Sequence, residues 1–174
     1  MFVLILLQGR CTVRRVRKLL AVRYNKNTMN KYRETYSRVD IKECVFCHWE
    51  KYNPGTIIKE NEDYILVPNT YPYIKDHLMV VIKEHVTHLL DEPFNEKKLE
   101  LTKEAMRLLE SLGIQSYVVI EREGQKAGKS VKHVHQHIIP VHEEHDITYN
   151  MAPMEHTINF QEQVETYKKL LGAK

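Results

Sequence analysis

The sequence predicts an α+β fold in which an antiparallel sheet packs against one long helix. Stretches with strand or helix patterns follow one another as strand, strand, helix, strand, strand, at residues 64–68, 77–82, 95–112, 117–120 and 133–140. The links between neighbouring strands are short. Short links favour antiparallel pairing over the crossover connections of a doubly wound sheet.

The first two strands are indicated by apolar runs that a loop separates. Residues 64–68 form a short run, and residues 77–82 form a run continuous enough for a buried strand. In the loop between them, Pro72 forces the preceding Tyr71 into an extended conformation. The chain therefore turns between the two strands.

The long helix is indicated by an apolar stripe with helical spacing. Leu101, Ala105, Leu108 and Leu112 fall at positions i, i+4, i+7 and i+11, and Gly113 supplies the usual helix end. Residues 117–120 follow as the third strand. A second helix is expected near residues 159–171, with an apolar face of Phe160, Val164, Tyr167 and Leu171.

The fourth strand carries three histidines, His133, His135 and His137, at a strict spacing of two. Successive side chains of an extended chain point to opposite faces, so the three imidazoles line one face. Two chemistries fit this arrangement. Neutral imidazole is the commonest metal ligand, and an imidazole nitrogen can also attack phosphorus to form a covalent intermediate.

Length and charge indicate one domain with a basic extension. The 174 residues, 43% of them apolar and 28% charged, are ordinary for one globular domain. Residues 1–28 hold seven Lys and Arg and no acid, so removing these seven charges from the net +3 leaves −4 for the rest. We expect residues 1–28 to be a poorly packed extension and residues 29–174 to form the domain. Its mild acidity argues against a broad nucleic-acid surface.

Targeting and cysteine patterns predict a cytoplasmic protein. The charges follow the first apolar residues instead of preceding them, the reverse of a secretory signal. No stretch approaches the roughly 20 apolar residues that span a bilayer, so no membrane association is expected. The three cysteines, Cys11, Cys44 and Cys47, are an odd and low count, typical of a reducing compartment.

The glycine-rich segment from Gly124 to Ser130 resembles a phosphate-binding P-loop, but it fails that test twice. The P-loop has four residues between its glycines, whereas Gly124 and Gly128 are separated by three. A P-loop also opens a helix, whereas this segment leads into the histidine strand. Its backbone N–H groups can still bind an anion in another way.

Together these motifs resemble the histidine triad family of nucleotide hydrolases and transferases. The signature His-x-His-x-His followed by two apolar residues fits residues 133–139, and the glycine loop fits residues 124–130. The nucleotide-side loop and strand fit residues 68–73 and 77–81, and Cys44-Val45-Phe46-Cys47 fits the zinc knuckle of the branch that acts on diadenosine polyphosphates. The resemblance implies a sheet of about five strands, one long helix and a homodimer.

The resemblance implies a role for each histidine of the triad. His135 is the expected nucleophile, attacking the α-phosphorus of a nucleotide. The backbone carbonyl of His133 is expected to accept a hydrogen bond from the inner ring nitrogen of His135 and so to set its tautomer. His137 is expected to donate a hydrogen bond to phosphoryl oxygens. Substrate contacts are implied for Asn69 at the ribose, His77 near the phosphates, and the leaving-group region of Arg122, Gly128, Lys129 and Ser130.

Some residues depart from the family pattern. Asp76 stands where a glycine usually precedes His77, and Gln136 is polar where an apolar residue is common. Lys129 replaces a usual glutamine and Arg122 a usual asparagine or glutamine. We expect these two added positive charges to favour a longer polyphosphate.

A structural zinc ion is the expected cofactor. Two thiolates two residues apart suit tetrahedral zinc, which needs two further ligands. In relatives with this knuckle the set is completed at positions matching His85 and His133, while His48 and His88 are rival ligands. An unmetallated or redox-active thiol pair is the alternative.

The expected function is a nucleotide hydrolase that forms a nucleotidyl-histidine and releases a nucleoside monophosphate from dinucleoside polyphosphates or nucleoside phosphoramidates. Three alternatives remain at this stage. The first is a transferase or phosphorylase with phosphate as acceptor. The second is a non-catalytic zinc- or nucleotide-binding regulatory module. The third is a nucleic-acid module built on the basic N-terminus.

Overall fold

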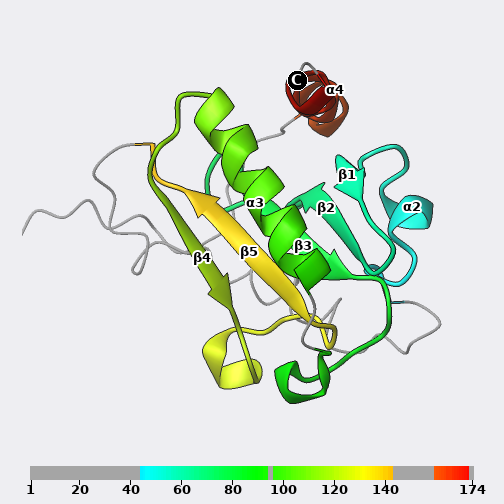
Figure 1. Ribbon diagram of the computed structural model, residues 1–174. Helices are drawn as coiled ribbons and strands as arrows, with labels where there is room; N and C mark the ends of the chain where they lie inside the picture. The colour runs from blue at the N-terminus through cyan, green and yellow to red at the C-terminus, as the bar shows by residue number, and fades with distance from the viewer. Residues whose placement is uncertain (1–43, 94–95, 143–158, 173–174) are drawn as a thin grey trace, which may run out of the picture.

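The computed structural model describes residues 44–93, 96–142 and 159–172. Its five strands form one antiparallel sheet in the order β1-β2-β3-β5-β4, which confirms the predicted α+β class (Figure 1). The strands are β1 Lys59–Glu60, β2 Tyr64–Pro68, β3 Leu78–Ile82, β4 Tyr117–Glu121 and β5 His135–Pro140. The predicted extension at residues 1–28 lies outside the described residues, and the domain boundary stays a prediction.

The described helices are α2 Trp49–Tyr52, α3 Glu96–Ser111 and α4 Phe160–Gly172, with 3₁₀ turns at Leu89–Asp91 and Gln125–Ala127. The predicted stripe of α3 is confirmed, since Leu101, Ala105 and Leu108 are fully buried. In the part of the chain that the structure describes, no helix is both long and apolar enough to cross a bilayer.

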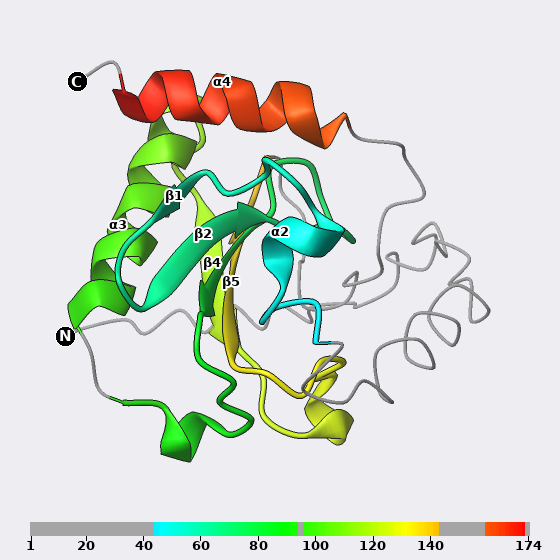
Figure 2. The same cartoon turned by 90° about the vertical axis from the view of Figure 1, so that its right-hand side faces the viewer.

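The two faces of the sheet are covered by different parts of the chain. Helix α3 lies over one face, and the segment that leads into α2 lies over the other (Figure 2). On the α3 side, Leu66, Val80 and Ile138 pack with the helix in the larger core cluster. On the opposite side, Val81 packs with Trp49 and the other apolar residues of the smaller cluster, Cys44, Phe46, Ile65, Val67, Met79 and Val131.

The register of β5 places its histidines on the smaller cluster's face. His135 lies opposite Val81 of β3, and His137 lies opposite Met79. Directly opposite residues of an antiparallel pair share a face, so both imidazoles point away from α3. The histidines thus stand on a sheet that a helix supports from behind.

Two sequence-based expectations need correction. His133 was placed on the histidine strand, but β5 begins at His135, because the backbone N–H of Val134 bonds to the carbonyl of Val86 at 2.7 Å instead of joining the ladder. The run 117–120 was expected as a core strand. It forms the edge strand β4 of the described sheet, where Val119 is 37% exposed.

Candidate active site and metal centre

The three triad histidines form a buried cluster on one face of the sheet. His133 is fully buried, and His135 and His137 are 8% and 5% exposed. The rings of His135 and His137 meet edge to face, with centroids 4.8 Å apart. Phe46 of the cysteine knuckle packs its ring edge against His135, with centroids 4.9 Å apart, a contact that the sequence did not predict.

The tautomer of His135 is set by the backbone. Its Nδ1–H donates to the carbonyl oxygen of His133 at 2.8 Å, which leaves the lone pair on Nε2. Burial lowers the pKa of His135 to about 4, and the positive charges of Lys129 and Arg122 act in the same direction. At neutral pH, His135 is therefore an uncharged imidazole whose Nε2 can act as a nucleophile.

A second relay of hydrogen bonds sets the tautomer of His137. The backbone N–H of Tyr73 donates to Nδ1 of His77 at 3.2 Å, so the proton of neutral His77 resides on Nε2. That Nε2–H donates to Nδ1 of His137 at 3.0 Å. His137 consequently carries its own proton on Nε2, where it can serve as a hydrogen-bond donor.

Both members of this relay are uncharged at neutral pH. Burial lowers the pKa of His77 to about 3, and Arg122 and protonated His135 have smaller effects in the same direction. Burial likewise holds the pKa of His137 well below its usual range. The relay can therefore donate hydrogen bonds to an anion, but it brings no positive charge to it.

Asn69 serves the same relay from the loop before β3. Its side-chain Oδ1 accepts the backbone N–H of Tyr71 at 2.9 Å, and its amide nitrogen lies 3.2 Å from Nδ1 of His77. Asn69 is 6% exposed. In this structure its amide therefore holds the loop and His77, while the expected ribose contact stays a prediction.

Arg122 and Gly128 meet at the rim of the histidine cluster. Nη1 of Arg122 donates to the Tyr73 hydroxyl at 3.1 Å, and the guanidinium lies 5.3 Å from the centre of the Tyr73 ring. Gly128 has φ +87°, and a Cβ there would lie 2.9 Å from Arg122 Nη1. The positive φ favours glycine at 128, and a larger residue there would also displace the Arg122 guanidinium.

Lys129 and Ser130 follow Gly128 in the chain, and Lys129 makes its hydrogen bonds within the protein. The Lys129 ammonium donates to the Thr87 carbonyl at 2.5 Å and to the Glu123 carboxylate at 3.1 Å. The Lys129 side chain is only 7% exposed. Ser130 is partly buried just before the triad. Lys129 therefore ties the glycine loop to the segment after β3.

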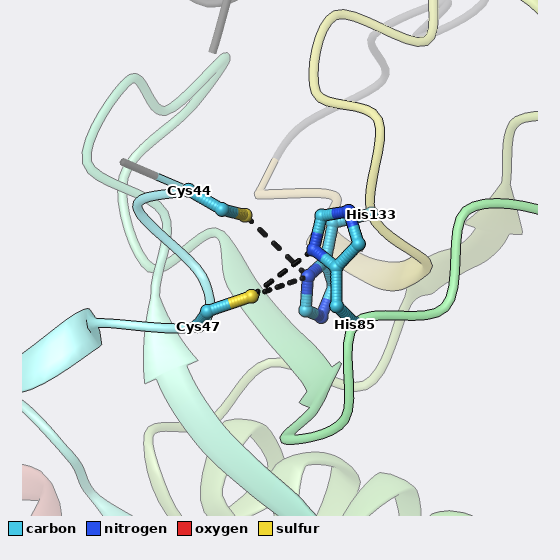
Figure 3. Close-up of side chains that lie close together, drawn as sticks. All are labelled: Cys44, Cys47, His85 and His133. Carbon is cyan, nitrogen blue, oxygen red and sulfur yellow. Dashed lines mark hydrogen bonds between the residues drawn. The ribbon is translucent and has the colours of Figure 1, made fainter. Parts of the chain in front are cut away.

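A potential metal centre adjoins the triad. Cys44, Cys47, His85 and His133 each offer one ligand atom, and these atoms all lie within 4.8 Å of one another (Figure 3). The structure thus brings together all four predicted ligands. The rival ligands lie outside this group: His48 is exposed, and His88 contacts Glu123.

The donor set fits a tetrahedral ion such as zinc. Nε2–H of His133 donates to the Ile82 carbonyl at 2.6 Å, which turns its Nδ1 lone pair toward the cysteines. That Nδ1 lies 3.5 Å from both Cys44 Sγ and Cys47 Sγ. In a tetrahedral zinc site, sulfur and nitrogen ligands lie about 3.5 Å apart. Burial, and then the adjacent Cys44, raises the pKa of the Cys47 thiol to about 12, so thiolates there call for a cation.

The chain is similar to several known proteins. An uncharacterized HIT-like protein of Methanocaldococcus jannaschii is 31% identical over 58% of this chain and 80% of its own length. The adenosine 5'-monophosphoramidase hnt1 of Schizosaccharomyces pombe is 29% identical over 56% of this chain and 73% of its own. A zinc-bound histidine triad family protein from Mycobacterium smegmatis shares the fold, with a TM-score of 0.60 at 20% identity over 76% of this chain and 95% of that one.

The family model of the HIT domain matches residues 50–144, more than half of the chain. The matched range contains the triad, the loop with Asn69 and the glycine loop, whereas the two cysteines of the knuckle precede it. On the match and the site geometry together, this chain belongs to the HIT domain family.

Proposed function

We propose that this protein is a nucleotide hydrolase that works through a covalent nucleotidyl-histidine at His135. The observation that carries the proposal is the bond from His135 Nδ1–H to the His133 carbonyl, because it leaves a neutral Nε2 as the reactive atom. The Schizosaccharomyces pombe relative, named an adenosine 5'-monophosphoramidase, supports a nucleotide substrate. Dinucleoside polyphosphates are the leading substrate class, followed by nucleoside phosphoramidates.

In the proposed reaction, His135 Nε2 attacks the α-phosphorus and the bond from phosphorus to the leaving group breaks. Nε2–H of His137, directed by the His77 relay, donates to a phosphoryl oxygen as negative charge builds there. Water then attacks the same phosphorus, the P–N bond to His135 breaks, and a nucleoside monophosphate leaves. Inorganic phosphate in place of water would release a nucleoside diphosphate.

Incubation of the protein with a dinucleoside tetraphosphate labelled at the α-phosphate tests the proposal. The wild-type protein should turn over and, after rapid acid-free quenching, carry label on His135. His135→Ala should lose the adduct and at least about 10³-fold of the rate, as expected for removal of a nucleophile. Products identified with and without added phosphate separate hydrolysis from phosphorolysis. Binding without turnover or adduct would favour the non-catalytic module instead.

We also propose a structural zinc ion bound by Cys44, Cys47, His85 and His133. The proposal is supported by the converging ligand atoms and by the zinc-bound relative from Mycobacterium smegmatis. Four protein ligands close a zinc site, so the ion would hold structure without activating water. Because the chain carries the cysteine knuckle, we also propose that it belongs to the branch of the family that acts on diadenosine polyphosphates.

A further inference from the structure

The relay that sets the tautomer of His137 depends on where the imidazole of His77 lies. Nε2–H of His77 donates to Nδ1 of His137 at 3.0 Å, and the backbone N–H of Tyr73 donates to Nδ1 of His77 at 3.2 Å. Hydrogen bonds weaken steeply with distance and misalignment, so a shift of His77 weakens both bonds. The proton of His137 is therefore only as well placed as the backbone that carries His77.

The residue before His77 makes a sharp turn into β3. Of the residues that the structure describes, Asp76 is the one non-glycine residue with a positive φ, at 64°, and it is 6% exposed. A glycine would supply this backbone conformation without any side chain. Aspartate tolerates the same conformation and adds a carboxyl group. The contacts of that carboxyl group therefore indicate what the side chain contributes.

The carboxyl group of Asp76 is held by helix α4, which lies across one end of the sheet (Figure 2). Its Oδ1 accepts hydrogen bonds from the Tyr167 hydroxyl at 2.5 Å and from the Gln163 amide at 2.9 Å. Burial, followed by the bond to Asp76, raises the pKa of Tyr167 well above its usual range, so the hydroxyl stays a donor at neutral pH. Val164 and Tyr167 anchor the helix in the larger core cluster. Helix α4 is thus a fixed support for Asp76.

The same turn is also tied to the strand that bears His137. His142 follows the end of β5 by two residues, and its Nε2–H donates to the Lys75 carbonyl at 3.0 Å. The same Nε2 lies 3.6 Å from Oδ2 of Asp76. The turn at residues 75–76 therefore contacts both α4 and the continuation of β5.

We propose that Asp76 is a positioning residue, through which helix α4 holds His77 in the geometry that keeps the proton of His137 on Nε2. This inference rests on the function proposed above, in which that N–H donates to a phosphoryl oxygen. Without the bonds to α4, His77 no longer fixes the hydrogen bond to Nδ1 of His137, and both tautomers of His137 are populated. The tautomer with its proton on Nδ1 points a lone pair at the phosphoryl oxygen and cannot stabilise it.

The kinetic test compares two variants of Asp76. Asp76→Gly removes the carboxyl group and relaxes the left-handed backbone, whereas Asp76→Asn keeps an oxygen acceptor for the donors of α4. With diadenosine tetraphosphate as substrate, Asp76→Gly should lower kcat by about 10- to 100-fold and leave KM within about 3-fold of wild type, because a misplaced donor is missed mainly in the transition state. For Asp76→Asn, kcat should stay within about 3-fold of wild type. Tyr167→Phe should lie between the two.

The tautomer of His137 can be measured without any substrate. NMR of the imidazole nitrogens in isotope-labelled protein distinguishes the ring nitrogen that carries the proton from the one that does not. The wild-type protein should show His137 protonated on Nε2 alone, and Asp76→Gly should show a mixture of tautomers. A wild-type protein that forms no His135 adduct would defeat the proposed function, whereas this tautomer measurement would still decide whether Asp76 positions His77.

A control on the same helix separates positioning from stability. Val164 is 1% exposed and makes none of the bonds to Asp76, so Val164→Ala should lower the unfolding free energy and still keep wild-type kcat and a single His137 tautomer. All variants are compared at a temperature at which circular dichroism shows them to be folded. Wild-type kcat with a single tautomer in Asp76→Gly would overturn the inference, and so would an equal loss in Val164→Ala. Where Asp76→Gly does not fold, the same outcomes in Tyr167→Phe decide.

Discussion

At the scale of single residues, the site depends on imidazoles that stay uncharged because they are buried. His77 is 2% exposed, and its pKa is lowered to about 3 by burial first and by nearby positive charges second. In an unfolded chain the same imidazole titrates near pH 6.5. Between these two pKa values, His77 is therefore protonated in the unfolded state and unprotonated in the folded state. In this interval stability rises with pH and is lost as the pH falls.

The resulting prediction concerns the acid stability of a His77→Gln variant. Between pH 6.5 and about pH 4, His77 should make the free energy of unfolding fall by about 1 kcal/mol for each pH unit of acidification. The variant lacks this titration, so the wild-type minus variant difference in unfolding free energy should decrease as the solution is acidified. Urea unfolding at several pH values measures it. A difference that is constant with pH would show that folding does not change the pKa of His77.

At the scale of elements, helix α4 is fastened to the loop that carries His77. The fastening point is Asp76, a buried non-glycine residue with φ 64°, in the left-handed region. Its Oδ1 accepts the Tyr167 hydroxyl at 2.5 Å and the Gln163 amide at 2.9 Å, both from α4. Aspartate tolerates left-handed backbone better than most residues other than glycine, and the two bonds from α4 hold the Asp76 side chain in place.

We predict that the side chain and the backbone of Asp76 contribute separately to stability. Tyr167→Phe removes a hydrogen bond to a buried carboxylate and should cost about 2 kcal/mol of unfolding free energy. Asp76→Asn retains an acceptor and tolerates the left-handed region, so it should cost less than Asp76→Ala, which loses both. Exposed Glu165→Ala on the same helix is the control, expected within about 0.5 kcal/mol of wild type. Equal effects of the two Asp76 variants would contradict this separation.

The elements themselves were largely predictable, and the contacts among them were not. The common face of His135 and His137 followed from the period of two, although His133 lies before the strand, and α3 followed from its stripe of leucines. The two-residue β1 carries too little pattern to be recognised, and β4 was taken for a core strand because apolar residues do not reveal which strand ends a sheet. His85 was predicted as a ligand only through the family resemblance. Its side chain lies near His133 because the fold brings together two segments that are distant in the sequence.

The same distinction applies to the charged and aromatic residues of the site. Arg122 and Lys129 were indistinguishable in sequence, since both are cations near a glycine loop, and only their surroundings separate them. Tyr73 was placed in a loop without a role. Its two hydrogen bonds become visible only in three dimensions: its backbone N–H donates to His77, and its hydroxyl oxygen accepts from Arg122.

At the scale of the whole molecule, the cysteine-histidine group joins three parts of the chain. The knuckle supplies two ligands before α2, His85 follows β3, and His133 precedes β5. Other described contacts also join these segments, among them the bond from Val134 N–H to the Val86 carbonyl and the packing of Phe46 on His135. A bound ion would thus fix the segment leading into the triad. The homodimer remains a prediction, and β4 is an edge strand only of the sheet that the described residues form.

We predict about one zinc per chain in protein purified without chelator, measured by elemental analysis. Removing the ion should lower the melting temperature by more than 10 °C, because metal binding at four ligands from three segments contributes several kcal/mol to folding. Cys44→Ser should lose most of the zinc. Cys11→Ser, outside the described residues, is the matched control and should keep it. Metal-free protein with an unchanged melting temperature would refute the structural role.

His133 takes part in both sites with different portions of the same amino acid. The ring belongs to the cysteine-histidine group, whereas the peptide oxygen orients His135. Every amino acid supplies a peptide oxygen, so a shortened side chain at 133 deletes a ligand and spares the acceptor. The proposed ion would therefore influence the nucleophile only through the position of the backbone at 133, and not through the chemical nature of the acceptor.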